Sequence, residues 1–282
     1  MVKIITDRAA DMPAAETAAL GIEVAPLFIN FPEGPVDSAE LEAGAFYDRL
    51  AAMFPEIPTT AQPSPGIFAG LYNQAAAEPV LSVHISSGLS GTIQAATIAA
   101  GDVDQEVTVV DTMTLSGGQR YQVLFAAQAV AAGWTIAQIV ERLAQIRAAT
   151  EVAFTLETLE YLARGGRIGR VQALAGSLLN IKPVIRVAHE DGKYSTVSKA
   201  RTLQRCMAQI VDFLAQRYGD EPLRATVMHG QLPVQAEALS ALLREKLSVV
   251  QTEVLRVSPV LGVHTGPGVV GAAVVPQRLM EL

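Results

Sequence analysis

Short apolar runs alternate with amphipathic stretches through the first 150 residues. Four of the runs have the length and the β-branched composition of strands, at residues 2–5, 24–29, 80–85 and 107–110. Apolar residues at helical spacing lie between them, for example over residues 66–77 and 93–100. Because strands that alternate with helices form helix-covered parallel sheets, this pattern predicts an α/β fold with a parallel sheet.

The pattern changes near residue 151, where we place a domain boundary. A strand is predicted at 152–155, followed by a section rich in glycine and arginine at 164–170. Two strand-like segments, 182–188 and 193–197, flank Asp191-Gly192, a dipeptide typical of hairpin turns. Next come a helix over about 199–218, a strand at 223–228, a helix at 233–246 and strands at 249–257 and 269–275. The sequence therefore predicts an N-terminal α/β domain (1–150) and a C-terminal α+β domain (151–282).

The composition is unusually apolar for a chain without a membrane segment. Half of the 282 residues are hydrophobic, and the mean hydropathy is +0.30, yet no stretch approaches the roughly 20 apolar residues that span a bilayer. A large aliphatic core explains the surplus, and an apolar ligand cavity is the alternative. The N-terminus reaches Asp7 without the apolar core of a signal peptide, so we expect a cytoplasmic protein without stable membrane insertion.

Charge and residue spacing argue against several classes of function. The net charge is −7 and the pI is about 5.2, which disfavours a nucleic-acid-binding scaffold. The four histidines lack metal-ligand spacing, and Cys206 is the single cysteine, so neither a metal site nor an internal disulfide is expected. A G-x-G-x-x-G match at 266–271 opens a β-branched run instead of a helix, which argues against nicotinamide or flavin. We therefore expect no cofactor.

Residues 85–92, Ile-Ser-Ser-Gly-Leu-Ser-Gly-Thr, have the chemistry of an anion site. They lie between a predicted strand and a predicted helix, where free backbone N–H groups and the helix dipole favour a negative ligand. The segment contains no Lys or Arg and does not match the phosphate loop, so a carboxylate fits better than a triphosphate. The alternative is that Ser90 or Thr92 only caps the helix.

Other polar loops follow neighbouring predicted strands. Polar residues follow three of the apolar runs: Thr6-Asp7, residues 86–88 and Asp111-Thr112. Ligands of open α/β sheets bind at the carboxyl ends of the strands, so these loops can share one crevice. The alternative is that they act as helix caps. Prolines stiffen the loop at 58–66, which contains Thr60. A stiff loop holds a hydroxyl donor in place at little entropic cost when a ligand binds.

Three further patterns leave alternatives open. The spacing at 88–92 is one residue short of G-x-S-x-G, and with His264 as a distant base it leaves a serine acyl hydrolase acting on lipid esters as the alternative function. The arginines at 164–170 either bind phosphate or form a solvated basic loop. Arg201 at a helix start is more often a surface residue, and His264 more often belongs to a turn.

Taken together, the motifs resemble the DegV family of bacterial fatty-acid-binding proteins along essentially the whole chain. The matching segments, in order, are residues 5–7 with Asp11, then 60–64, 86–92, 111–118, 165–168, 180–183, 200–202 and 264–266. The resemblance implies that one long-chain fatty acid is buried at the domain junction, with Thr60 and Ser90 binding its carboxylate. It also implies that Arg201 and His264 lie near the head group or the transferred phosphate.

The same resemblance implies the role of the chain. In the family, a separate ATP-dependent fatty acid kinase converts the bound acid into an acyl phosphate for phospholipid synthesis. The chain would then be a lipid-binding carrier with the kinase as its partner, not an enzyme itself. A regulatory module that binds another small carboxylate is a third possibility.

Overall fold

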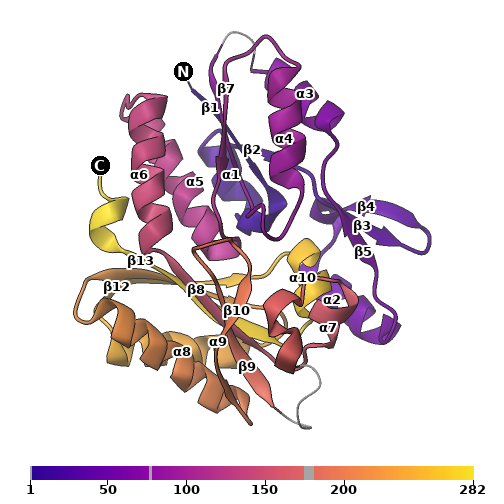
Figure 1. Cartoon of the computed structure of the whole chain (residues 1–282), viewed down its shortest axis with the longest axis vertical. Coiled ribbons are helices and arrows are strands. Elements are labelled where there is room, and N and C mark those ends of the chain that lie inside the picture. The colour runs from indigo at the N-terminus through magenta and orange to yellow at the C-terminus, as the bar shows by residue number, and fades with distance from the viewer. Residues whose placement is uncertain (1, 76–77, 175–180) are drawn as a thin grey trace.

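The computed structural model describes residues 2–75, 78–174 and 181–282. Two large sheets lie in the two halves of the molecule, with helices between them and on their outer faces (Figure 1). This arrangement confirms the predicted mixed α/β fold. Asn180 of the motif at 180–183 and Ala76 and Ala77 of the predicted helix at 66–77 lie outside the described residues.

The first sheet is parallel throughout, as the alternation of strands and helices predicts. Its spatial order is β2 (Glu23–Ala25), β1 (Lys3–Asp7), β6 (Val80–His84) and β7 (Val107–Asp111). All five residues of β6 are buried, because helices cover both faces of the sheet. One face packs on α3 (Pro65–Asn73) and α4 (Thr92–Gly101), and the other packs on α5 (Ser116–Ala131).

The second sheet is mixed and belongs entirely to the C-terminal half. Its spatial order is β10 (Tyr194–Ala200), β9 (Lys182–Val187), β8 (Glu151–Leu156), β13 (Val269–Pro276), β11 (Leu223–His229) and β12 (Val249–Arg256). Strands β9 and β10 form the hairpin that Asp191-Gly192 predicts. The outer face packs on α8 (Leu203–Tyr218) and α9 (Pro233–Lys246), and the inner face packs on α5 and α6 (Ile136–Ala149).

A smaller three-stranded sheet and short helices lie beside the two large sheets, at the right of Figure 1. The sheet contains β4 (Gly34–Asp37), β3 (Phe28–Phe31) and β5 (Thr59–Ala61), which pair antiparallel. Three helices lie near it: α2 (Ala43–Met53), α7 (Glu160–Arg164) and α10 (Pro259–Thr265). The remaining short elements are α1 (Ala14–Ala19) and 3-10 turns at Arg8–Ala10, Ser38–Glu40, Gly169–Leu174 and Gln277–Met280.

One hydrophobic core is continuous between the two large sheets. It contains residues from both halves of the chain, including Leu81, Phe125, Val152 and Met280. The strands of the first sheet precede residue 150 and those of the second sheet follow it. Because the core is shared, the division into a domain of residues 1–150 and a domain of residues 151–282 stays a prediction. No helix in the described parts of the chain combines the length and apolar composition needed to cross a bilayer.

Two predicted elements differ from the structure. The strand predicted at 24–29 is two strands in different sheets, because Pro26 lies between β2 and β3 and lacks the N–H that would continue pairing. The helix predicted from residue 199 begins at Leu203, because Lys199 and Ala200 still pair with β9. The Thr202 side chain then accepts from Arg205 N–H and caps α8.

Candidate functional site

A cavity of about 240 Å³ lies where the small sheet, the loop after β6, α10 and the β9–β10 hairpin come together. Its polar lining residues are Thr60, Gln62, Ser90, Arg167 and His264. Its other lining residues are Leu27, Ala61, Ile85, Leu89, Tyr194, Val260 and Leu261. The cavity therefore combines a small polar group, drawn from distant parts of the sequence, with a mostly apolar wall.

Thr60 and His264 are 204 residues apart and form a direct hydrogen bond. Thr60 lies in β5, where pairing with Ile29 of β3 fixes the backbone, and Pro58 and Pro63 flank the strand. His264 lies in the last turn of α10, all of whose residues are buried. The Thr60 Oγ1 to His264 Nε2 distance is 2.8 Å.

Burial keeps the His264 imidazole neutral. Loss of solvent, assisted by the nearby positive charge of Arg167, lowers the pKa of His264 from 6.5 to about 4. A neutral imidazole carries one N–H, and Nδ1 of His264 has no hydrogen-bond partner among the described residues. We assign the proton to Nε2, so that His264 donates to Thr60 and the Thr60 hydroxyl hydrogen remains available for a ligand.

A glycine makes room for the imidazole. A Cβ atom at Gly165 would lie 2.3 Å from His264 Nδ1, which is far inside van der Waals contact. Residue 165 follows α7, which packs against α10. Gly165, part of the glycine and arginine section, therefore permits the close approach of α7 to the histidine.

Ser90 lies just before α4 and faces the same cavity. Its Oγ lies 2.8 Å from Thr92 Oγ1 and accepts a hydrogen bond from Thr92 N–H at 3.3 Å. Gly91 occupies the N-cap position, so the predicted capping by Ser90 holds only as this single contact with the first residue of the helix. The hydroxyl still lines the cavity, beside the positive end of the α4 dipole.

A second, narrow apolar space lies beside the cavity. Tyr194 and Leu261 line both spaces. This second space has a volume of about 20 Å³ and is lined by further apolar residues, among them Leu115, Val152, Phe154, Met228, Val257 and Val269. A ligand with a polar head and a long apolar tail matches this shape.

Two glycines interlock the loop after β6 with the turn of the β9–β10 hairpin. Ser86 Oγ donates to Gly192 O at 2.8 Å, and Gly88 N–H donates to Ser86 Oγ at 3.1 Å. A Cβ at Gly192 would lie 1.9 Å from Ser86 Oγ, and one at Gly88 would lie 2.3 Å from Asp191 O. The C-terminal half thus fixes the position of the loop that presents Ser90.

Comparison with known proteins identifies the fold. A family model described as "Uncharacterised protein, DegV family" matches residues 1–277. The chain belongs to the DegV family. A DegV domain-containing protein of Deinococcus radiodurans is 37% identical over 278 residues, which cover 97% of this chain and 95% of that relative.

Solved structures of DegV proteins show the same fold. A DegV family protein from Thermus thermophilus, whose structure concerns fatty acid binding, has a TM-score of 0.90 and 33% identity, with 98% of this chain and 99% of that chain covered. DegV of Bacillus subtilis, a fatty acid binding protein, has a TM-score of 0.88 and 28% identity, with 98% and 99% covered. The structural neighbours are therefore DegV proteins that bind fatty acids, and the family resemblance seen in the sequence is confirmed.

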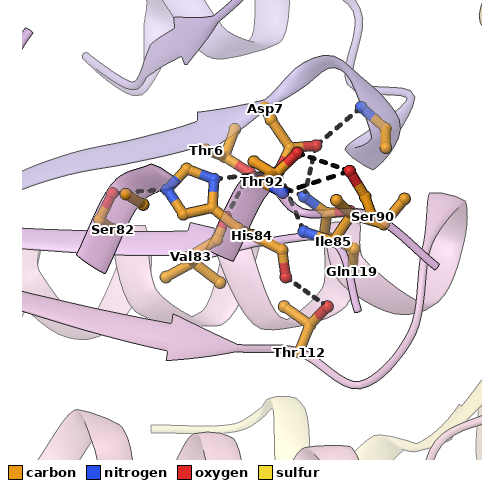
Figure 2. A network of polar contacts seen from close by, with 12 residues as sticks. Thr6, Asp7, Ser82, Val83, His84, Ile85, Ser90, Thr92, Thr112 and Gln119 are labelled. Carbon is orange, nitrogen blue, oxygen red and sulfur yellow. Dashed lines mark hydrogen bonds and ion pairs between the residues drawn. The ribbon is translucent and has the colours of Figure 1, made fainter. Parts of the chain in front are cut away.

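The polar loops of this DegV chain converge, but mainly on one another. Figure 2 shows Thr6, Asp7 and Thr112 around His84 and the start of the loop after β6. Thr6 Oγ1 donates to Val83 O at 2.8 Å, and Thr112 Oγ1 donates to His84 O at 2.7 Å. These residues are buried and do not line the cavity. The predicted crevice is therefore a closed network that supports the Ser90 loop.

A buried relay of side chains runs through the centre of this network (Figure 2). Asp7 Oδ2 accepts from His84 Nδ1–H and from Ile85 N–H, both at 2.9 Å. Ser82 Oγ lies 2.6 Å from His84 Nε2 and 3.0 Å from the Tyr72 hydroxyl. Burial raises the pKa of Tyr72 to about 12, so its hydroxyl stays protonated. The relay joins β1, α3 and β6 of the DegV fold.

The structure brings three of the four predicted site residues to the cavity. Thr60, Ser90 and His264 line it, whereas Arg201 is exposed and follows β10 at the end opposite Tyr194. At about 3.3 Å per strand residue, Arg201 lies roughly 20 Å along the strand from Tyr194. A role for Arg201 near the head group or the transferred phosphate therefore stays a prediction, because the side chain does not line the cavity.

Sequence reasoning did not select Arg167, Gln62 or Tyr194 as site residues of the DegV chain. Arg167 is the arginine that lines the cavity, although the whole section 164–170 had been considered for phosphate binding. Its charge, its position after a Gly-Gly pair and its place in the family-like segment 165–168 were the signals available. In the described parts of the chain, no three His, Cys, Asp or Glu side chains cluster as metal ligands would.

Proposed function

We propose that this chain binds one long-chain fatty acid, with the carboxylate beside Thr60, Ser90 and His264 and the acyl chain along the apolar cavity. The observation that carries the proposal is the Thr60–His264 hydrogen bond in the wall of a mostly apolar cavity. A neutral imidazole that donates to a threonine hydroxyl orients the hydroxyl hydrogen toward an acceptor in the cavity. The fatty-acid-binding neighbours support this ligand class.

The polar residues satisfy the requirements of a buried carboxylate. Moving an unpaired carboxylate out of water costs at least several kcal/mol of free energy. Several hydrogen-bond donors are therefore needed to offset that cost. Thr60 and Ser90 supply hydroxyl groups, and the first turn of α4 supplies backbone N–H groups without helical partners. Arg167 adds a positive charge at the cavity wall. The head group therefore determines orientation more than affinity.

The apolar wall supplies the affinity. Each methylene removed from water contributes about 0.8 kcal/mol, so a long acyl chain gains on the order of 10 kcal/mol before ordering costs. The narrow space beside Tyr194 and Leu261 would take the end of the acyl chain into the core between the two sheets. The surplus of aliphatic residues in the sequence thus serves both a core and a ligand cavity.

In the second part of the proposal, the chain presents the carboxylate to a separate ATP-dependent kinase, which forms an acyl phosphate for phospholipid synthesis. Gln62 and Arg167 line the head-group end of the cavity and are exposed, so a partner can reach that end. The sequence contains no phosphate loop of its own, which leaves nucleotide binding to the partner. The chain acts as a carrier, and the cytoplasm supplies both ATP and kinase.

The serine hydrolase alternative finds less support in the geometry. His264 Nε2 bonds to Thr60 and not to Ser90, and no carboxylate contacts His264 Nδ1 among the described residues. A triad needs an imidazole that bonds to its nucleophilic serine and is oriented by a third group. We therefore retain the carrier proposal.

The deciding experiment is a reconstituted phosphorylation assay. Purified protein is loaded with a radiolabelled long-chain fatty acid and mixed with MgATP and the catalytic subunit of a bacterial fatty acid kinase. Acyl phosphate is expected with the wild type and is expected to fall at least tenfold with Ser90→Ala, because the carboxylate loses a donor. Ser86 is unsuitable as a control because it fixes the loop, so the exposed Ser87→Ala serves instead.

Two results would contradict the proposal. Acyl phosphate formed at the same rate without the chain would remove the carrier role. Turnover of chromogenic esters by the wild type that disappears in Ser90→Ala would instead identify an acyl hydrolase.

A further inference from the structure

A second concave region, of about 530 Å³, lies between α6, α8 and the turn of the β9–β10 hairpin. Three arginines, one histidine and two glutamates line it, together with Phe213: Arg147, Arg186, Arg217, His189, Glu151 and Glu190. None of these residues lines the fatty-acid cavity. We call this region the arginine pocket.

The arginine pocket is positive in a chain that is negative as a whole. Its three guanidinium groups exceed its two carboxylates by one charge with the histidine neutral, against a net charge of −7 for the protein. One of the two carboxylates, Glu190, has a side chain that is 75% exposed and is free to turn toward solvent. The other, Glu151, is 2% exposed and stays in the pocket.

The guanidinium groups have hydrogen-bond donors to spare. The Arg186 guanidinium makes no hydrogen bond within the described residues, because its nearest carboxylate oxygens, on Glu151 and Glu190, are 3.9 and 4.0 Å away. Its Nε is also buried without a partner. Arg217 and Arg147 each donate to one backbone carbonyl, which leaves most of their five N–H groups unused.

We propose that the arginine pocket binds a phosphate group. Planar guanidinium forks match the oxygens of a phosphate, and several of them around one concave space can share a dianion. Glu151 has a positioning role here, because its Oε1 lies 3.0 Å from His189 Nε2 and 3.6 Å from Arg217 Nε. Phe213 supports the Arg186 guanidinium, whose carbon is 5.9 Å from the ring centroid.

Two structural connections join the arginine pocket to the loop that carries Ser90. Arg147 donates to Asp111 O at 3.1 Å, and the Asp111 carboxylate accepts from Ser87 N–H at 3.3 Å. The hairpin turn supplies His189 to the pocket, and its Gly192 accepts from Ser86. The proposal itself does not rest on fatty acid binding, because every group it uses lies outside the fatty-acid cavity.

The test is a titration of the full chain with inorganic phosphate, in which ¹H–¹⁵N NMR spectra measure binding at each step. Potassium chloride at matched ionic strength controls for general screening. We expect saturable shifts confined to amides near residues 147–151, 186–190 and 213–217. Arg217→Gln should weaken binding about tenfold or more, because hydrogen bonds to a charged group are lost. Arg278→Gln, which removes an exposed arginine paired with Glu221, should not.

The outcomes separate clearly. If a soluble phosphate monoester binds more tightly than inorganic phosphate, the proposal is supported and the ligand is a phosphorylated metabolite. If the two bind equally, the proposal is supported and the ligand is free phosphate. Shifts that chloride reproduces, or a phosphate affinity unchanged in both Arg217→Gln and Arg186→Gln, would overturn it. Arg217 is half exposed, so its variant should fold even if the Arg186 variant does not.

Discussion

The chain contains two imidazole–hydroxyl pairs of nearly the same geometry in very different surroundings. In the parallel sheet, His84 Nε2 lies 2.6 Å from Ser82 Oγ, and beside the cavity His264 Nε2 lies 2.8 Å from Thr60 Oγ1. His84 also bonds to Asp7, which completes a Ser-His-Asp set. Judged by residue types alone, the first pair is the better candidate for a site.

Access and unused hydrogen-bonding capacity reverse that judgement. Asp7, Ser82 and His84 are almost completely buried, and both ring nitrogens of His84 have partners. His264 borders a cavity, and its Nδ1 has no partner among the described residues. The comparison teaches that a satisfied and sealed set stabilises a fold, whereas a partly satisfied set at an apolar cavity can bind a ligand.

The largest expected effect is on stability, through Asp7→Ala. The substitution leaves the N–H groups of His84, Ile85 and Ala9 without their acceptor in a closed interior. We expect the free energy of unfolding to fall by about 3–5 kcal/mol in urea denaturation. Glu23→Ala, which breaks the half-exposed pair with Lys3, serves as control and should cost less than about 1 kcal/mol. Equal losses in the two variants would break the comparison.

The next effect is the pH dependence that His264 causes. Its pKa is lowered to about 4 in the fold from 6.5 when unfolded, so the unfolded chain takes up the proton first as pH falls. The fold should therefore lose up to about 3 kcal/mol between pH 7 and pH 4 relative to His264→Gln. Urea denaturation of both proteins at several pH values measures the difference.

The pH experiment must compare wild type with variant. Burial raises the pKa of Asp11 to about 6, so Asp11 favours the fold at low pH and opposes the effect of His264. Because both proteins contain Asp11, its contribution cancels in the difference. Stability curves that stay parallel from pH 7 to pH 4 would show that His264 is not held neutral by burial.

Thr60→Val should affect binding more than stability. Valine keeps the shape of the side chain but removes the hydroxyl between His264 and the proposed carboxylate. We expect fatty acid affinity to fall by about 10- to 100-fold in fluorescent fatty acid displacement, which corresponds to about 1.5–3 kcal/mol. Thr60→Ser is the matched control and should bind within a few-fold of wild type. If Thr60→Val is less stable in urea but binds fatty acid as tightly as wild type, the Thr60–His264 hydrogen bond stabilises the fold, as the Ser82–His84 contact does.

Arg201→Ala should have the smallest effect on binding. The side chain is exposed and does not line the cavity, so we expect fatty acid affinity within about twofold of wild type. The same displacement assay measures it. A loss as large as that of Thr60→Val would place Arg201 at the head group after all.

Local sequence patterns predicted most of the fold but not how the site is assembled. The apolar run ending in Ser86-Ser87-Gly88 predicted β6 and its loop, and Asp191-Gly192 predicted the hairpin, because both signals lie within a few residues. Local patterns do not specify which sheet a strand joins. For that reason they predicted neither the division of residues 24–29 into β2 and β3 at Pro26 nor the edge strand β5 that contains Thr60. Thr60 and Ser90 were each recognised as hydroxyl donors, but their meeting with His264 depends on the long-range packing of α10 against β5.

The resemblance to the family supplied what the residues alone did not. It placed His264 near the head group or the transferred phosphate, whereas the residues alone offered His264 only as a distant base for a hydrolase. It also selected Arg201, whereas the structure places Arg167 at the cavity. Arginine side chains are long and exposed, so their final positions depend on loops that carry little sequence pattern.

Native mass spectrometry of freshly purified wild type and Thr60→Val, followed by denaturation and organic extraction, tests the central claim most directly. The account predicts one long-chain fatty acid per wild-type chain and a clearly reduced occupancy in the variant. A wild-type protein that is empty and ignores added long-chain acids, or a variant with unchanged occupancy, would contradict it.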